Sequence, residues 1–340
     1  MNKINSKNDI KIGIVGTNFV HDWFCDAAKL CGILPTSVFS RARKTGIDFA
    51  KKHGIENVFC DFDVFANSDL INCAYVASPN AFHFEQTAKL LMAGKHVICE
   101  KPLCSNSREL SYLYELAEKN GLVLLEAMRP AHDSATDVIK ELLPLCGKIR
   151  YCHFEYSQYS SRYDKFKEGI MTNAFNPDLS NSALMDIGVY PLHLCVLLFG
   201  KPKSVVSKSV KLENGFEGMG NAILEYDGKT CEIAYSKITE SNGYSFIRGE
   251  NAEIRFGKAP SKITDIELVK NDGTKIPTGF CPVGNNMVFE IDAFCDFVTG
   301  VRDCAPYITA TRHTITVMDE IRKQNGIIFP ADKAQWNIQK

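Results

Sequence analysis

The stretch VICEKPLC, residues 97–104, ends an apolar run in three residues that a core strand rarely carries: Glu100, Lys101 and Pro102. An acid and a base side by side cost free energy where a buried strand stops, unless they are paired or take part in chemistry. A lysine withdrawn from water has a lowered pKa, because burial disfavours its charged form, and it can then move protons near neutral pH. Lys101 is therefore the first candidate for acid–base chemistry.

A second candidate pair lies further along the chain in ALMDIGVYPLH, residues 183–193. Asp186 and Tyr190 are spaced i, i+4, which places both on one face of a helix, so that they can approach the same substrate atom. Taken alone, Tyr190 is better explained as an amphipathic core residue; the EKP motif upstream shifts the interpretation to a functional role. His193 follows three residues after Tyr190 and is either a substrate contact or a structural histidine.

The elements that must position these residues differ between the two parts of the chain. The first third alternates short apolar runs with helical patterns over residues 81–93 and 107–120, which is typical of parallel strands joined by crossover helices. Strands this apolar are covered on both faces, so the sequence predicts an α/β domain with a doubly wound parallel sheet. The predicted strands cover residues 11–15, 36–39, 57–60, 73–77, 96–99 and 123–127.

After about residue 130 the pattern changes, so we expect a first domain over residues 1–130 and a second over 131–340. Asp227-Gly228 stands between two alternating segments and is a strong hairpin signal, which Asn271-Asp272-Gly273 repeats. The second domain is therefore predicted to be α+β with a mostly antiparallel sheet. Its helices are expected over residues 134–143, 286–299 and 310–325.

Composition excludes several classes of protein. The chain has 340 residues, 45% of them hydrophobic, and a formal net charge of -1, so no basic field attracts nucleic acid or anionic membranes. The amino terminus is polar, no membrane span is expected, and the cytoplasm is the default location. The thirteen cysteines are scattered without C-x-x-C or zinc spacing, which favours reduced thiols over disulfides or a metal site.

A glycine turn follows the first predicted strand in KIGIVGTNFV, with a helix directly after it. In a dinucleotide-binding turn the backbone approaches the pyrophosphate and the helix amino terminus offers free N–H groups, here over Gly16, Thr17, Asn18 and Phe19. In a G-x-G-x-x-G frame Asn18 replaces the second glycine and His21 the third. Asparagine tolerates positive φ, which would keep the turn intact. A generic strand-to-helix turn is the alternative.

The end of the second strand bears on the choice of cofactor. An NAD enzyme usually carries a carboxylate there, whereas this chain has Ser40 and Arg41, followed by Arg43 and Lys44. A serine hydroxyl and a guanidinium bind a 2′-phosphate, which predicts NADP, with NAD as the alternative. The other interpretation is that Arg41 is only a solvated residue in the first turn of a helix.

The fourth strand ends in a turn of Ser78, Pro79 and Asn80, at the sheet edge where open α/β sheets bind ligands. His83 opens the next helix. It is either a further cofactor contact or a helix-end residue satisfied by the backbone.

Together, GIVGTN, SPNAFH, EKP and ALMDIGVYPLH resemble the Gfo/Idh/MocA oxidoreductase family, named for glucose-fructose oxidoreductase and inositol dehydrogenase. The resemblance spans nearly the whole chain. Ser40-Arg41 and a tyrosine at position 190 look most like the branch of NADP-dependent sugar dehydrogenases and dimeric dihydrodiol dehydrogenases. The family fold is a Rossmann domain followed by an α/β domain with a large open sheet. The exposed face of that sheet commonly joins subunits, so the resemblance implies a homodimer or higher homo-oligomer.

The resemblance also implies roles for the residues. Lys101 would lie beside the nicotinamide and the substrate hydroxyl, Glu100 would orient this cofactor-binding region, and a cis Lys-Pro bond is common here. Tyr190 would be the acid/base, with Asp186 binding the substrate or tuning the tyrosine. The implied reaction transfers hydride between NAD(P) and a carbinol or carbonyl of a sugar, polyol or vicinal diol. The loop between residues 158 and 181 would select the substrate through residues such as Arg162 and Asn173.

Two departures from the family pattern stand out. Asn181-Ser182 replaces the usual Gly-Gly before ALMD, and Asn18 stands in the glycine turn.

Two other functions remain open: a glycoside hydrolase that uses tightly held NAD in redox-assisted cleavage, and a nonenzymatic sensor of nucleotide or sugar levels. The chain has all three residues to which the resemblance assigns catalytic roles, Lys101, Asp186 and Tyr190, and this argues against a nonenzymatic sensor.

Overall fold

The structure is a computed structural model of the chain, and it describes residues 4–257 and 259–335. The chain folds into two compact units, each built around its own sheet. Unit 1 comprises Met1–Cys104, Arg108–Asp133 and Val283–Thr309, and unit 2 comprises Ser105–Ser107, Ser134–Pro282 and Ala310–Lys340.

The sheet of unit 1 has six strands in the order β3-β2-β1-β4-β5-β6, and every neighbouring pair is parallel. The chain starts in the middle, moves outward to β3 and returns to β4, so the strand order reverses between β1 and β4. The predicted doubly wound parallel sheet is confirmed. Its strands are β1 (Ile12–Val15), β2 (Ser37–Phe39), β3 (Asn57–Phe59), β4 (Cys73–Val76), β5 (His96–Glu100) and β6 (Leu124–Ala127).

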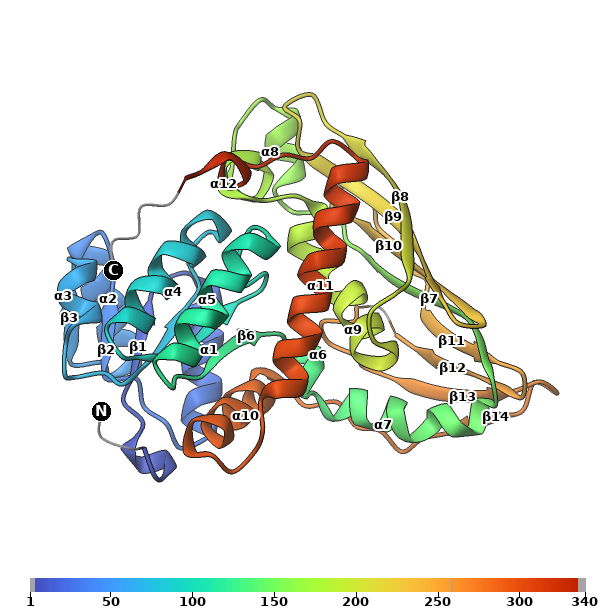
Figure 1. Cartoon of the computed structure of the whole chain (residues 1–340), viewed down its shortest axis with the longest axis horizontal. Helices are drawn as coiled ribbons and strands as arrows, with labels where there is room; N and C mark the ends of the chain where they lie inside the picture. Colours follow the sequence, from blue (N-terminus) through green and yellow to red (C-terminus); the bar gives the residue numbers. More distant parts are fainter. Residues whose placement is uncertain (1–3, 258, 336–340) are drawn as a thin grey trace. The chain divides into compact units, whose positions relative to one another are not determined.

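Helices cover both faces of this sheet (Figure 1). On one face α1 (Phe19–Leu30), α2 (Arg43–His53) and α10 (Met287–Thr299) contribute to a single apolar core. The placement of α10 corrects the sequence prediction, which assigned this helix to the second domain. Its apolar stripe packs beside α1 and not against the antiparallel sheet. Further helices of this unit are α3 (Phe62–Ala66), α4 (His83–Met92), α5 (Ser107–Lys119) and α6 (Arg129–His132), with 3-10 turns η1 (Lys7–Asp9) and η2 (Asn80–Phe82).

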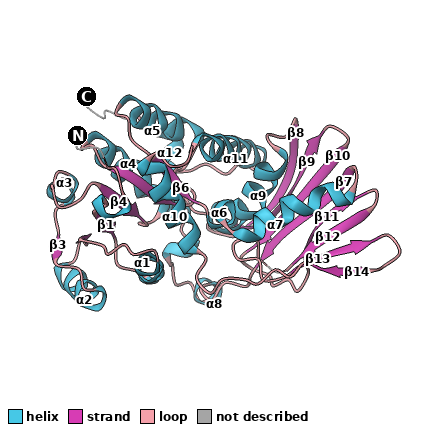
Figure 2. Ribbon diagram, turned by 90° about the horizontal axis from the view of Figure 1, so that it is seen from below, coloured by secondary structure: helices cyan, strands magenta, loops and turns pink. Residues whose placement is uncertain are grey.

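The sheet of unit 2 has eight strands in the order β14-β13-β12-β11-β7-β10-β9-β8 (Figure 2). All neighbours are antiparallel except β7 and β10, which run parallel. Both predicted hairpins are confirmed, because residues 227–228 join β9 to β10 and residues 271–273 lie between β13 and β14. The strands are β7 (Ile149–Ser157), β8 (Ser204–Lys211), β9 (Glu217–Tyr226), β10 (Lys229–Ser236), β11 (Ser245–Gly249), β12 (Ala252–Phe256), β13 (Ile266–Lys270) and β14 (Lys275–Pro277).

One face of this sheet carries α7 (Ser134–Leu142), α9 (Val189–Phe199) and α11 (Ala305–Gln324), as Figures 1 and 2 both show. Helix α11 begins five residues earlier than residue 310, where the sequence pattern placed its start. The carboxylate of Asp303 accepts a hydrogen bond from the backbone N–H of Ala305 at 2.9 Å and caps the extra turn. The shorter helical segments are η3 (Leu143–Cys146), α8 (Tyr163–Lys167), η4 (Asn173–Phe175), η5 (Pro177–Leu179), a π-helical turn (Leu184–Gly188) and α12 (Pro330–Lys333).

One stretch of the described residues, Pro177–Phe199, is long and apolar enough by composition to cross a membrane. Within it, 78% of the most apolar window is buried inside the protein, so packing in unit 2 accounts for its hydrophobicity. The thirteen cysteines carry free thiols, most of them buried. Within residues 4–257 and 259–335 no group of three or more histidine, cysteine or acidic side chains is arranged to hold a metal ion.

Candidate active site

The glycine turn after β1 has its positive φ at Gly16, where φ is 118°. Asn18 has φ of −87° and caps α1, because its Oδ1 accepts a hydrogen bond from Val20 N at 2.9 Å. The expectation that Asn18 supplies a positive φ is therefore wrong. An N-cap residue needs an extended backbone, and Asn18 takes that role. Phe19 begins the helix with its side chain largely exposed, directly after Thr17 and Asn18.

The side chain of His21, at the third glycine position, closes over this turn. A Cβ atom on Gly16 would lie only 2.5 Å from the imidazole, so the two positions are complementary. The ring Nε2 donates to Val15 O at 2.8 Å, and Asn18 N donates to Nδ1 at 3.0 Å. Burial lowers the pKa of His21 to about 4, so the ring is neutral at pH 7, as these two hydrogen bonds require.

Arg41 lies at the end of β2 with its guanidinium carbon 5.9 Å from the centre of the Phe82 ring, a cation–π contact. Phe82 follows β4, so the pair bridges two strand ends at the ligand-binding edge of the sheet. Ser40 is buried, and its hydroxyl contacts Ala42 O at 3.0 Å and Thr45 Oγ1 at 2.9 Å. The guanidinium of Arg41 therefore lies against an aromatic ring and is not only solvated.

The turn after β4 is braced by His83. Its ring nitrogens lie 2.7 Å from Ser78 O and 2.9 Å from Pro102 O, and burial lowers its pKa. Each ring nitrogen thus lies within hydrogen-bonding distance of a backbone carbonyl. This agrees with the interpretation that the backbone satisfies the hydrogen-bonding groups of His83. Ser78 donates to Gln86 Oε1 at 2.7 Å, and Pro79 and Asn80 continue into η2. His83 thus ties this turn to the residue after Lys101.

The end of β5 is fixed from two sides. Tyr75 Oη donates to Glu100 Oε1 at 2.7 Å, and Leu103 N donates to the buried Glu126 at 3.0 Å. The peptide bond between Lys101 and Pro102 is cis. These contacts hold the backbone that carries Lys101 at the carboxyl edge of the parallel sheet, where ligands bind in open α/β folds.

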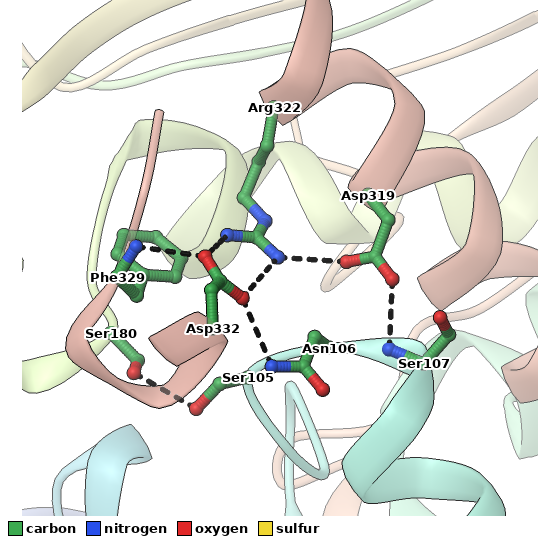
Figure 3. A network of polar contacts seen from close by, with 8 residues as sticks. All are labelled: Ser105, Asn106, Ser107, Ser180, Asp319, Arg322, Phe329 and Asp332. Carbon is green, nitrogen blue, oxygen red and sulfur yellow. Dashed lines mark hydrogen bonds and ion pairs between the residues drawn. The ribbon is translucent and has the colours of Figure 1, made fainter. Parts of the chain in front are cut away.

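A buried arginine organises the segment that follows the EKP turn (Figure 3). The side chain of Arg322, on α11, is 5% exposed, and its guanidinium lies 2.8 Å from both Asp319 and Asp332 and 4.6 Å from the centre of the Phe329 ring. Burial alone would raise the pKa of Asp332, but its hydrogen bonds, with that from Arg322 the largest, outweigh this effect and lower it. The two carboxylates and the guanidinium form a charged network inside unit 2.

The same network holds residues 105–107, shortly after Lys101 in sequence (Figure 3). Asn106 Nδ2 donates to Asp332 at 3.0 Å, and the backbone N–H of Ser107 donates to Asp319 at 2.8 Å. Ser105 Oγ donates to Ser180 Oγ at 2.8 Å, and Ser180 has a positive φ of 54°. The segment after the EKP turn is therefore anchored within unit 2, next to the stretch that leads to Asp186.

Asp186 lies in the π-helical turn before α9, whereas Tyr190 is in α9 itself. The predicted single regular helix is therefore wrong in its turn geometry, because a wider π-helical turn leads directly into α9. Contacts from elsewhere in unit 2 account for the wider turn: Glu217, fully buried, accepts from Leu184 N at 2.9 Å. Gly188 allows the Tyr235 ring to approach, because a Cβ atom there would lie 2.7 Å from that ring. Such π-helical turns occur frequently at functional sites.

Beside Asp186 is a small pocket of about 200 Å³ within unit 2. The Asp186 side chain is 38% exposed and forms an ion pair of 2.7 Å with Lys237, whose side chain is 4% exposed. Sequence reasoning missed Lys237, because a single lysine after a strand carries no motif. The pocket is lined by Gln158, Tyr159, Ser160, Ser161, Asp186, Ile187 and Lys237.

The other predicted substrate residues are placed differently. Tyr190 is buried, with its ring 5.9 Å from that of Tyr156. His193 is buried, burial lowers its pKa to about 4, and its Nδ1 has no hydrogen-bond partner among the described residues. Arg162 and Asn173 are exposed on neighbouring turns and are not among the residues that line the pocket.

The side chains that replace the family's Gly-Gly pair are used locally. Asn181 Nδ2 donates to Asn173 O at 3.1 Å, and Ser182 Oγ accepts from Met185 N at 3.2 Å. Both bonds stabilise the approach to the π-helical turn that carries Asp186. The departure from glycine therefore strengthens the local structure before the candidate acid.

Comparison with known proteins identifies relatives over almost the whole chain. The chain is 37% identical to scyllo-inositol 2-dehydrogenase (NADP(+)) IolU of Bacillus subtilis (strain 168), covering 96% of this chain and all of that protein. It is 23% identical to trans-1,2-dihydrobenzene-1,2-diol dehydrogenase of Sus scrofa, covering 95% and 99%. Among solved structures, KijD10, a 3-ketoreductase from Actinomadura kijaniata in complex with NADP and TDP-benzene, has the same fold. Its TM-score is 0.83 at 20% identity, covering 94% of this chain and 99% of that one.

Two family models match the two parts of the chain. The model of the oxidoreductase family with an NAD-binding Rossmann fold matches residues 10–128, and that of the GFO/IDH/MocA C-terminal domain matches residues 145–255. The family predicted from EKP and ALMDIGVYPLH is confirmed. Its branch, that of NADP-dependent sugar dehydrogenases and dihydrodiol dehydrogenases, is confirmed as well, and so is the prediction of an oxidoreductase. The chain has a parallel Rossmann sheet and a large, mostly antiparallel second sheet, and it matches a relative along that protein's whole length. It belongs to the Gfo/Idh/MocA family of oxidoreductases.

Proposed function

We propose that the protein is an NADP-preferring dehydrogenase or reductase that acts on a neutral polyol, sugar or vicinal diol. The observation that carries this proposal is the pocket beside Asp186, where a carboxylate stands among hydroxyl and amide side chains. Such groups exchange hydrogen bonds with several substrate hydroxyls. Two of the relatives, an NADP-dependent inositol dehydrogenase and a diol dehydrogenase, support the same substrate class and cofactor.

The residues of unit 1 fit a dinucleotide. Gly16 has no side chain where a pyrophosphate would approach, and the capped amino terminus of α1 follows directly. We assign Thr17, Asn18 and Phe19 to the diphosphate. We assign Ser40 and Arg41 to the 2′-phosphate of NADP, because no carboxylate stands there to repel it. The turn at residues 78–80 and Glu100 complete the cofactor site. When bound, this cofactor accepts or supplies the hydride.

The acid–base work falls to Lys101 and Tyr190. As the carbinol C–H bond breaks and hydride leaves, the hydroxyl proton passes to Tyr190, with Lys101 polarising the same oxygen; reduction reverses both transfers. Asp186 accepts a hydrogen bond from a neighbouring substrate hydroxyl. Arg162, Asn173 and His193 remain proposed substrate contacts.

We further propose that the protein is a homodimer or larger homo-oligomer joined through the sheet of unit 2. No helix of the described residues covers the face opposite α7, α9 and α11 (Figure 2). That face carries Ile223, 52% exposed, and a cluster in which Tyr151 donates to Glu232 at 2.7 Å and Arg248 lies over Phe246. The thirteen free thiols fit the reducing cytoplasm, which we propose as its location.

The proposal is tested by a panel of inositols, aldoses and vicinal diols with NADP⁺ and NAD⁺, followed by nicotinamide absorbance. We expect stoichiometric NADPH formation with at least one neutral polyol. Cleavage of a glycoside without net change in cofactor would indicate the hydrolase instead. Tight NADP(H) binding without turnover of any compound would indicate the sensor. Size-exclusion chromatography with light scattering measures the oligomeric state. Finding only monomer would contradict the proposed interface through the sheet of unit 2.

A further inference from the structure

Lys237, just after β10, is a buried ammonium whose contacts converge on the candidate active site. Its Nζ lies 2.7 Å from Asp186 Oδ2 and donates to the carbonyl of Ala174 at 2.7 Å. The rings of Phe175 and Phe216, both fully buried, lie 4.9 and 5.4 Å from the same nitrogen. One carboxylate, one carbonyl and two aromatic faces therefore surround the charge.

This environment makes the ion pair directional. An ammonium taken out of water must regain its interactions from fixed partners, and here the carboxylate of Asp186 is the partner with a full charge. The phenyl faces attract the cation electrostatically, but they do not replace an oxygen atom as acceptor of its N–H hydrogen bonds. The ammonium is therefore held on the Oδ2 side of Asp186, while the carboxylate stays partly exposed beside the pocket.

The backbone of Lys237 also holds a segment that lines the same pocket. Its carbonyl accepts a hydrogen bond from Ser160 N at 2.9 Å, and its N–H donates to Gly218 O at 2.9 Å. Just before it, Ser236 O accepts from Gln158 N at 2.8 Å. Lys237 thus contacts both the Asp186 carboxylate and the loop of hydroxyl side chains that lines the same pocket.

We propose that Lys237 is a positioning residue that orients the Asp186 carboxylate to accept a hydroxyl of a neutral vicinal polyol, next to the carbon that is oxidised. This inference rests on the proposed function and names the substrate feature that the site reads. Because the Lys237 charge is already matched by Asp186, the described residues that line the pocket offer no second cation to a carboxylate or phosphate. Sugar acids and sugar phosphates are therefore poorer substrates than the neutral polyols.

The test compares the best polyol of the panel with its deoxy analogue, which lacks the hydroxyl beside the reacting carbon. Lys237→Met keeps an unbranched side chain of similar length and removes its charge. For the polyol we expect kcat/KM to fall about 10- to 100-fold, the range for a hydrogen bond to a charged group. For the analogue we expect less than about a 3-fold fall, because the contact with Asp186 is already absent. Lys270→Met, at an exposed lysine of the same unit, is the matched control and should change neither value.

A purely structural role gives a different pattern. If Lys237→Met slows the polyol and the analogue equally, or if its effect is undiminished in an Asp186→Asn background, the proposal is overturned. Should Lys237→Met fail to fold, Lys237→Arg serves in its place: it retains the charge and should retain the preference for the polyol, and loss of that preference contradicts the proposal. Absence of turnover by the wild-type protein on every polyol would instead overturn the proposed function.

Discussion

The guanidinium of Arg322 lies 2.8 Å from the carboxylate of Asp332, and this ion pair anchors the segment that follows the candidate catalytic lysine. Because the Arg322 side chain is only 5% exposed, its removal leaves two partly buried acidic partners without their cation. The pair therefore connects the carboxyl-terminal residues of unit 2 to the residues just after the EKP turn. Its loss should affect stability first.

Arg322→Met should lower the free energy of unfolding by about 3 to 5 kcal/mol, since breaking a buried pair strands the remaining charges. Urea unfolding followed by circular dichroism measures the change. Lys140→Met removes an exposed ion pair with Asp137 in the same unit and should cost less than about 1 kcal/mol. Equal losses in the two variants would contradict the structural role of Arg322.

Acid should destabilise the protein through its buried histidines. Burial lowers the pKa of His21 and of His193 to about 4, below their value in the unfolded chain. The unfolded chain therefore binds protons that the folded one does not, so stability is complete above about pH 6.5 and falls as the pH drops towards 4. His193→Gln should remove about 1.4 kcal/mol per pH unit from this slope. The free energy of unfolding at about pH 7 and about pH 5 tests this, and an unchanged slope in the variant would contradict it.

Glu290 on α10 should cost stability at neutral pH. The side chain is fully buried, its two oxygens have no hydrogen-bond partner among the described residues, and burial together with the charge of Glu100 raises its pKa well above the usual value. A raised pKa contributes stability below about pH 4.5 that is lost as the pH rises through the folded value. Glu290→Gln should therefore gain stability over the wild type as the pH increases.

Denaturant midpoints at about pH 4.5 and about pH 7.5 measure this gain. The stability difference between variant and wild type should grow by about 1.4 kcal/mol for each pH unit between about pH 4.5 and the pKa of Glu290 in the folded protein. Glu85→Gln, at an exposed carboxylate on α4, is the control and should show no pH-dependent gain. A gain that is equal at both pH values would mean that the effect comes from packing and not from ionisation.

Arg41→Ala should change cofactor preference. The guanidinium at the end of β2 is the cation proposed for the 2′-phosphate, and a hydrogen bond to a charged group is worth about 1.5 to 3 kcal/mol. We expect NADPH affinity to fall about 10- to 100-fold with NADH affinity nearly unchanged. Fluorescence titration with both cofactors tests this, with Lys51→Ala on the exposed side of α2 as control. A wild-type protein that binds NADH as tightly as NADPH would contradict the role of Arg41.

Lys101→Ala and Tyr190→Phe should lose turnover while keeping NADPH binding. General acid–base groups contribute about 10²- to 10⁴-fold to a rate, so kcat should fall by that order in each variant. Single-turnover absorbance measures the hydride step, and fluorescence quenching measures the bound cofactor. Near-normal hydride transfer in both variants would end this mechanism.

The amino-acid sequence by itself determined the two sheets, because their signals are local. Apolar runs at strand length, glycine caps and the turn at Asp227-Gly228 act within a few residues, and both hairpins and the parallel sheet followed from them. EKP and ALMDIGVYPLH identified the family for a similar reason, since each motif is contiguous in the chain.

Only the tertiary structure decided which distant groups meet. The pattern of α10 shows an amphipathic helix but not which sheet it covers, and burial with α1 settles that question. His21 departs from a glycine motif, yet its ring fills the space over Gly16. Lys237 carries no local signal, and its pairing with Asp186 depends on β10 delivering it beside the π-helical turn. Periodicity reports burial along one element, whereas the partner of a buried charge is set by the packing of several elements.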